Sequence, residues 1–117
     1  MARHLFFAFT APVAGREDEF NSWYDGVHLD DVLQVDGMVS AQRFEVSPQF
    51  GTPDILPGYL AIYEVEIADD KPEALEELSR RAGTALMRIS DALDINQAKT
   101  FLATPITDRR TPKATED

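Results

Sequence analysis

The chain has 117 residues, 44% of them hydrophobic and 9% aromatic, which is enough for one globular domain with a modest core. The absence of cysteine excludes disulfides, thiol catalysis and thiolate metal sites, and is typical of proteins in a reducing cytoplasm. A formal net charge of −10 argues against binding to nucleic acids or anionic membranes, and no apolar run approaches the roughly 20 residues that span a bilayer.

The first predicted element is a strand over residues 4–10, which is apolar at every position except its two ends. A basic start followed by apolar residues also resembles a signal peptide, but the run is short and stops at Pro12, so we expect a strand. A helix is predicted over residues 17–35. Acidic residues crowd its first turn, where the helix macrodipole favours negative charge, and Gly37 follows its end.

The middle of the chain predicts two more strands. Residues 38–47 form one with broken alternation, and residues 58–67 form one with regular alternation, in which Tyr59 and Tyr63 share a face. The proline- and glycine-containing segment 48–57 is expected to be the loop that joins them.

The last third of the chain predicts a helix over residues 72–95 with one apolar face, which Gly83 can bend or interrupt. A final strand over residues 96–104 follows. We expect residues 1–104 to form one domain and residues 105–117 to be a polar tail.

This order, β-α-β-β-α-β, predicts an α+β fold of the ferredoxin-like type, with two helices on one face of a four-stranded antiparallel sheet. The uncovered face of that sheet would be too apolar to remain in water, because its first strand is rich in phenylalanine. Pairing two such sheets solves the problem, so the sequence predicts a homodimer.

The first helix contains the most informative pattern in the chain. Trp23 and the polar series Tyr24, His28 and Asp31 are separated by helical steps that make side chains neighbours. A histidine between a phenol and a carboxylate can transfer a proton near neutral pH, because its ordinary pKa is about 6.5. The alternative is a structural histidine that ties the helix to a strand.

The segment EFNSWYDGVHLDDVLQVDGMVSAQRFEV resembles the signature of dimeric α+β barrel proteins, close to the EthD-like branch. The resemblance implies that two ferredoxin-like sheets pair into a barrel. It also implies a small-molecule enzyme or a related binding protein, because the superfamily includes cofactor-independent cyclases, monooxygenases, isomerases, dehydratases and haem enzymes. Haem-binding branches carry a proximal histidine on the second helix, and residues 72–95 contain none, so no cofactor is expected.

The resemblance places His28 at the motif histidine, Trp23 and Tyr24 at the aromatic pair, and Arg43 at the strand arginine. We predict His28 as a general acid or base that is oriented by Asp31, with Tyr24 stabilising a developing oxyanion. Trp23 is predicted to bind substrate as a stacking platform. Core packing is the alternative for Tyr24, and core or dimer packing is the alternative for Trp23. Arg43 is either a clamp for an acidic or phenolate substrate or a structural ion pair with an acid such as Glu64 or Glu45.

Four aromatic residues of the strands complete the predicted substrate site. They are Tyr59 and Tyr63, which line a cavity or pack against a helix, and Phe7 and Phe9, which line the same pocket or belong to a dimer core. No cluster of metal ligands is evident, so no metal is expected.

The sequence as a whole therefore predicts a cytoplasmic, cofactor-independent enzyme of the isomerase, cyclase, dehydratase or lyase type. Its substrate would be an aromatic or polyketide-like oxygenated molecule. The alternative functions are a non-catalytic carrier of a small ligand, and a structural dimer.

Overall fold

The computed structural model describes residues 2–51, 57–69 and 71–113. Its elements follow in chain order: β1 (Ala2–Thr10), α1 (Glu17–Trp23), the π-helical turn η1 (Tyr24–His28), α2 (Leu29–Leu33), β2 (Met38–Glu45), β3 (Tyr59–Ile67), α3 (Glu73–Arg81), the 3₁₀ turn η2 (Ile95–Gln97) and β4 (Lys99–Ala103). The predicted loop 48–57 and tail 105–117 extend partly beyond the described residues.

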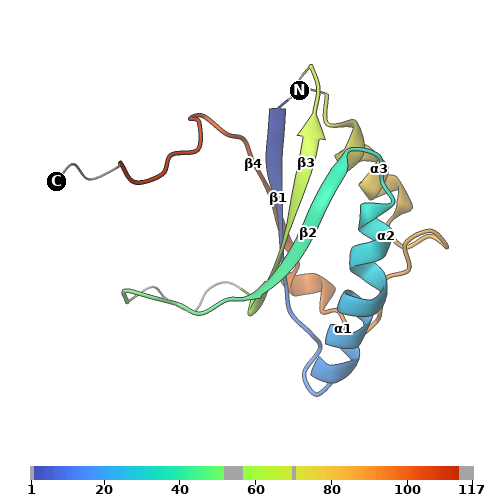
Figure 1. The fold of residues 1–117 in the computed structure, drawn as a ribbon. Helices are drawn as coiled ribbons and strands as arrows, with labels where there is room; N and C mark the ends of the chain where they lie inside the picture. Colours follow the sequence, from blue (N-terminus) through green and yellow to red (C-terminus); the bar gives the residue numbers. More distant parts are fainter. Residues whose placement is uncertain (1, 52–56, 70, 114–117) are drawn as a thin grey trace.

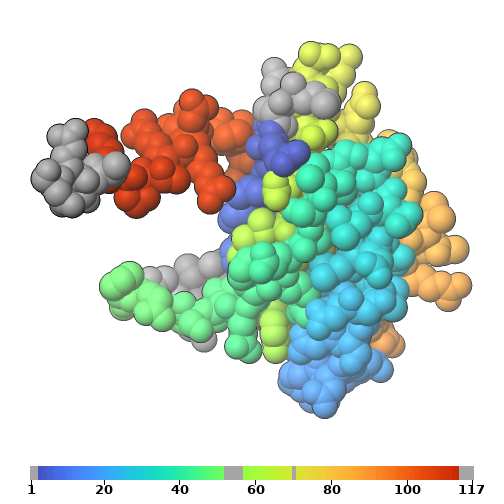
Figure 2. Space-filling model, viewed as in Figure 1, coloured from blue at the N-terminus to red at the C-terminus, as the bar shows by residue number. Residues whose placement is uncertain are grey.

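The four strands form one antiparallel sheet in the order β2-β3-β1-β4. Figure 1 shows α1, α2 and α3 together on one face of this sheet, while the loop after β2 and the C-terminal tail project on the other side. The space-filling view shows the same two projections standing clear of the body (Figure 2). The predicted ferredoxin-like α+β fold is confirmed.

Alternation along the strands decides which side chains meet the helices. The helix-facing side of the central strand β3 carries Ala61, Tyr63, Val65 and Ile67, all of them buried. Phe20, Tyr24 and Val32 of the first helical segment pack against this face in one core cluster. The core thus lies between the sheet and the helices.

The first predicted helix is interrupted and the second is much shorter than predicted. α1 and α2 are separated by the π-helical turn. α3 ends at Arg81 rather than near residue 95, and Gly83 follows it with a φ of +83°. The Gly83 N–H donates to the Met87 carbonyl at 2.8 Å, so the chain turns away from the helix axis here. Gly83 therefore interrupts the predicted helix, because few residues other than glycine adopt this φ cheaply.

Gly37 joins α2 to β2 at a φ of +98°, and a Cβ at this position would lie 3.1 Å from the Cβ of Ala74. Gly37→Ala is therefore expected to lower the free energy of unfolding by about 2 kcal/mol in urea denaturation, through backbone strain and crowding. The matched control is Gly26→Ala, where a Cβ would meet nothing within 4 Å. Equal effects of the two substitutions would contradict this explanation.

The sheet face opposite the helices carries a patch of apolar side chains that has no cover within the described chain, beside an ion-paired group of Arg3, Glu64 and Glu66. Phe9 and Phe101 meet edge to face at 5.9 Å on this face, and Leu5, Phe44 and Phe101 are 36%, 40% and 51% exposed. Phe7 pairs with Ile62 here as well.

Candidate functional site

A cavity of about 170 Å³ lies between the helix-facing side of the sheet and the helical layer. Strands, the first helical segment, α3 and the chain after α3 all contribute to its wall. The residues that line it are Phe6, Ala8, Thr10, Trp23, Tyr24, His28, Val32, Tyr63, Leu78, Ala82, Met87, Ile89, Leu93 and Thr100. The wall is mainly apolar with a few polar side chains, as in small-ligand sites.

The π-helical turn positions two of the polar groups at the cavity. The Leu29 N–H donates to the Tyr24 carbonyl, five residues back, and Gly26 lies exposed in the middle of the turn. Single π-helical turns inside α-helices occur frequently at functional sites. The turn brings the rings of Tyr24 and His28 into an edge-to-face contact at 4.9 Å.

His28 is packed between aromatic rings and has a free polar atom. Its imidazole stacks on the Trp23 indole at 4.6 Å between ring centroids, and the indole N–H donates to the Arg88 carbonyl at 3.1 Å. The Nδ1 atom of His28 is buried and makes no hydrogen bond to any described part of the chain. His28 lines the cavity, and its imidazole is not tied to the described main chain through Nδ1.

Burial lowers the pKa of His28 to about 4, partly offset by the Asp31 carboxylate and reinforced by the positive charge of Arg43. The imidazole is therefore neutral at pH 7, one nitrogen being a donor and the other an acceptor. This corrects the prediction of a histidine that titrates near neutral pH. In the free protein His28 is therefore an unprotonated but weak base.

Tyr63 and Thr10 also line the cavity and carry buried polar atoms. The Tyr63 hydroxyl and Thr10 Oγ1 interact with the Tyr24 hydroxyl, but neither makes a hydrogen bond of normal geometry to the described chain. Burial raises the pKa of Tyr24 and of Tyr63, so both phenols stay protonated. A buried polar group without a partner costs about 1–3 kcal/mol, so a ligand that supplies partners would gain affinity.

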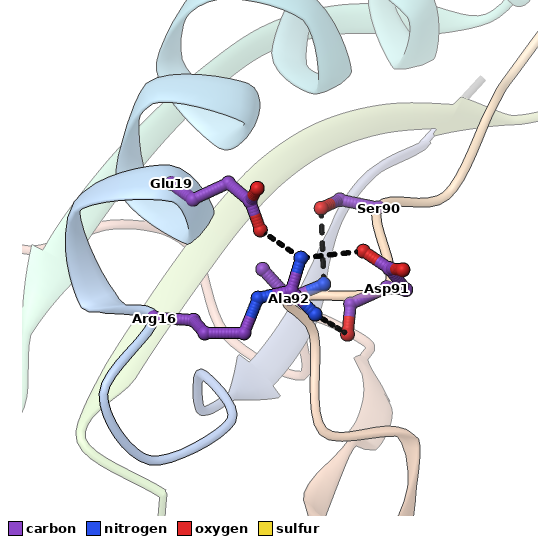
Figure 3. A network of polar contacts seen from close by, with 5 residues as sticks. All are labelled: Arg16, Glu19, Ser90, Asp91 and Ala92. Carbon is purple, nitrogen blue, oxygen red and sulfur yellow. Dashed lines mark hydrogen bonds and ion pairs between the residues drawn. The ribbon is translucent and has the colours of Figure 1, made fainter.

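The far wall of the cavity is irregular chain that contacts the start of α1. Arg16 donates to the Asp91 carbonyl at 3.1 Å and to its carboxylate at 2.7 Å, and also pairs with Glu19 (Figure 3). The Val13 N–H donates to the Ala92 carbonyl at 2.7 Å. These contacts fix the segment that carries two of the wall residues, Ile89 and Leu93.

Arg43 is nearly buried but is not part of the cavity wall. Its guanidinium donates to the carboxylate of Asp25 at 2.7 Å and to the side-chain oxygen of Asn21 at 2.9 Å. It also lies 4.4 Å from the centre of the Tyr24 ring. The structure does not support the predicted substrate clamp. The partner is Asp25 rather than Glu64 or Glu45, and these contacts connect the first helical segment to β2.

Four of the predicted site residues come together at the cavity, namely Trp23, Tyr24, His28 and Tyr63. The others are placed elsewhere. Asp31 influences His28 only through its charge, with no hydrogen bond to Nδ1, and Tyr59 packs against Phe20 with its hydroxyl 3.4 Å from Asn21 Nδ2.

Phe7 and Phe9 are on the opposite face of the sheet from the cavity, since they pair with Ile62 and Leu60 rather than with the helix-facing residues. The pocket-wall interpretation of these two residues is therefore wrong, and the dimer-core alternative stays a prediction. Sequence reasoning missed Thr10, although its even position in β1 placed it on the same face as Phe6 and Ala8.

Neither a family model nor a curated protein matches this chain. Solved structures of the same fold do. A proposed monooxygenase from Shewanella loihica is 14% identical, with a TM-score of 0.59, over 92% of this chain and 97% of that one. A mutant of MhuD, with two manganese protoporphyrin IX molecules bound per active site, is 15% identical, with a TM-score of 0.55, over 92% and 99%.

An EthD-family protein from Bacillus halodurans is 9% identical, with a TM-score of 0.51, over 91% of this chain and 100% of that one. The chain has the fold of the dimeric α+β barrel proteins. At these identities the likeness establishes the fold, and it agrees with the resemblance found in the sequence.

The site does not fit a porphyrin. Pockets for drug-sized ligands measure about 300–1,000 Å³, and this cavity has about 170 Å³. The segment after β3 also lacks the histidine that haem-binding branches carry there. Among the described residues there is no group of three or more His, Asp or Glu side chains arranged to hold a metal ion. Within the same ranges, no helix is long and apolar enough to cross a membrane.

Proposed function

We propose that the protein is a cofactor-independent enzyme in which His28 is the general base acting on a small oxygenated molecule. The observation that carries this proposal is the buried, unpartnered Nδ1 of a neutral His28, a residue that lines a mainly apolar cavity. A base needs an unprotonated acceptor atom that reaches the substrate, and this nitrogen supplies one.

In the proposed reaction, His28 Nδ1 takes a proton from a carbon next to a carbonyl group or from an enolic hydroxyl. The electron pair of the broken bond moves to the substrate oxygen, where the Tyr63 and Tyr24 hydroxyls donate hydrogen bonds to the developing charge. The imidazolium then returns the proton to a different atom, which completes an isomerisation. Loss of a leaving group from the same enolate would give the dehydratase or lyase variant.

The fold supports an enzyme without deciding the reaction. The proteins that share it include a proposed monooxygenase, a porphyrin-binding MhuD mutant and an EthD-family protein. The activity proposed for the first protein and the porphyrin bound to the second favour a small-molecule substrate over a macromolecular partner. The cytoplasmic location stays a prediction from the absence of cysteine.

The proposal is tested by finding a ligand and following its fate. Small oxygenated molecules are screened by thermal shift, and each one that binds is incubated with the protein and analysed for chemical change and for oxygen uptake. We expect turnover that depends on His28. A non-catalytic carrier is the second candidate, favoured by the weak basicity of a His28 with a pKa of about 4, and it predicts binding with no product.

We also infer that two copies of the chain pair through the uncovered sheet face. Phe101→Glu would place a charge on this apolar face, where Phe101 is 51% exposed, and is expected to convert a dimer into a monomer in light scattering. The matched control is Leu86→Glu, at a leucine 63% exposed in the chain after α3, which should leave the molar mass unchanged. A monomeric wild-type protein would contradict the inference.

A further inference from the structure

The described residues that line the cavity include no Asp, Glu, Lys or Arg. The cation beside Tyr24, on Arg43, is already bonded to Asn21 and Asp25 and does not belong to the wall. An anion that entered would lose its hydration without meeting a countercharge, which is strongly unfavourable. The chemistry of the wall therefore selects a molecule with no formal charge.

Cavity size restricts the ligand further. The cavity has about 170 Å³, close to the engineered cavity of about 150 Å³ that binds benzene. Aromatic and aliphatic side chains supply most of the wall, among them Phe6, Trp23 and Leu93. This space matches a single six-membered ring more closely than a fused two-ring system.

The polar atoms of the lining residues then determine which substituents that ring needs in order to form hydrogen bonds. His28 Nδ1 comes from the helical layer, whereas the Tyr63 hydroxyl and Thr10 Oγ1 come from the neighbouring strands β3 and β1. The Tyr63 and Thr10 oxygens interact with the Tyr24 hydroxyl, whereas His28 Nδ1 has no partner in the described chain. A ligand with one oxygen near His28 and a second near these hydroxyls would therefore pair with both groups. Buried polar atoms are normally paired in native proteins.

We propose that the cavity binds a neutral, single-ring phenol or cyclic ketone with two oxygen substituents. One oxygen belongs to a hydroxyl group that donates a hydrogen bond to His28 Nδ1. The other oxygen accepts a hydrogen bond from Tyr63 or Thr10. This inference rests on the proposed function only because it takes this cavity as the functional site. It narrows the substrate class by excluding multi-ring polyketides and carboxylates.

The experiment measures binding by calorimetry at pH 7 for resorcinol and two matched compounds. One is 3-hydroxybenzoate, which replaces a hydroxyl by a carboxylate, and the other is 1,3-dihydroxynaphthalene, which adds a ring. We expect resorcinol to bind at least about tenfold more tightly than either. A carboxylate without a countercharge, or a second ring, is expected to weaken binding by at least that factor. Equal or tighter binding of the anion or the two-ring compound, or no binding of resorcinol, would overturn the inference.

Variants locate the polar contact. Tyr63→Phe is expected to weaken resorcinol binding about 5- to 20-fold, as expected for one lost hydrogen bond, while the melting temperature of the free protein stays the same or rises because an unpartnered hydroxyl is removed. The matched control, Tyr59→Phe, lies outside the cavity wall and should leave the affinity unchanged. A lower melting temperature for Tyr63→Phe with unchanged affinity would mean a structural role and would overturn the proposed contact.

Because this experiment measures binding and not turnover, it separates the inference from the proposed function. Selective binding of the neutral ring without any product would leave the substrate class standing and remove the catalytic proposal. His28-dependent turnover of a carboxylate would support the catalytic proposal and contradict the proposed substrate class.

Discussion

Replacing His28 with glutamine is expected to lower the turnover rate about 10²- to 10⁴-fold, the usual contribution of one positioned base. Glutamine keeps a polar side chain of similar length but has no basic nitrogen, so the fold and the cavity should persist. The measurement is kcat for the substrate found by screening, with circular dichroism to confirm folding. Turnover that survives the substitution would show that another group is the base.

Asp31→Asn is the matched control for this experiment. The carboxylate of Asp31 raises the pKa of His28 but makes no hydrogen bond to its Nδ1, so removing the charge should change turnover by less than about tenfold. If Asp31→Asn reduced turnover as strongly as His28→Gln, the two residues would work as a hydrogen-bonded pair, contrary to the observed geometry.

The pH dependence follows from the same histidine. Its pKa is about 4 in the folded protein, so kcat/KM is expected to stay constant from pH 8 to about pH 5 and to fall only when Nδ1 becomes protonated near pH 4. A histidine with its ordinary pKa of about 6.5 would instead show the fall between pH 7 and 6. A pH–rate profile with that midpoint would contradict burial as the controlling effect.

Stability should respond to pH in the same range. Between pH 6.5 and 4 the unfolded chain binds a proton at His28 that the folded chain does not, so the free energy of unfolding decreases as the pH falls through this interval. The loss amounts to up to about 3 kcal/mol, and it should be absent in His28→Gln. Urea denaturation of both proteins at pH 7 and pH 4 measures the difference. Comparing the two proteins cancels the contribution of the acidic groups that they share.

Replacing Arg43 with alanine is expected to lower the free energy of unfolding by about 2–4 kcal/mol. The Arg43 side chain is only 12% exposed. Its guanidinium lies over the rings of Tyr24, Tyr59 and Phe20 and bonds to two residues of the first helical segment. Truncation removes this packing and frees the π-helical turn from β2. Urea denaturation measures the loss.

Two further variants separate packing from charge. Asp25→Asn weakens only an ion pair whose acid is 65% exposed, and such pairs contribute about 1 kcal/mol or less. Arg43→Lys keeps the charge but loses the planar fork, so its effect should be intermediate. If Asp25→Asn were as costly as Arg43→Ala, the ion pair rather than the ring stacking would hold the turn.

Much of the fold was predictable because its signals are local in the sequence. Alternation in β3, acidic residues at the start of α1 and Gly37 after α2 each reflect the conformational preferences of a few adjacent residues. The contact of Tyr24 with His28 was likewise predictable, since residues four apart on a helix are neighbours. Where a local signal was ambiguous, prediction failed: apolar residues of 82–93 match a helical period, but Gly83 ends the helix.

The sequence by itself determined the order of the elements, the apolar face of each and the histidine most suited to chemistry. Only the tertiary structure decided which atoms of that histidine are free, why its pKa is low and which strand residues complete the cavity. The burial of His28 and the pairing of Arg43 with Asp25 depend on segments that are separate in the chain. Such contacts arise when elements pack together, so no local pattern encodes them.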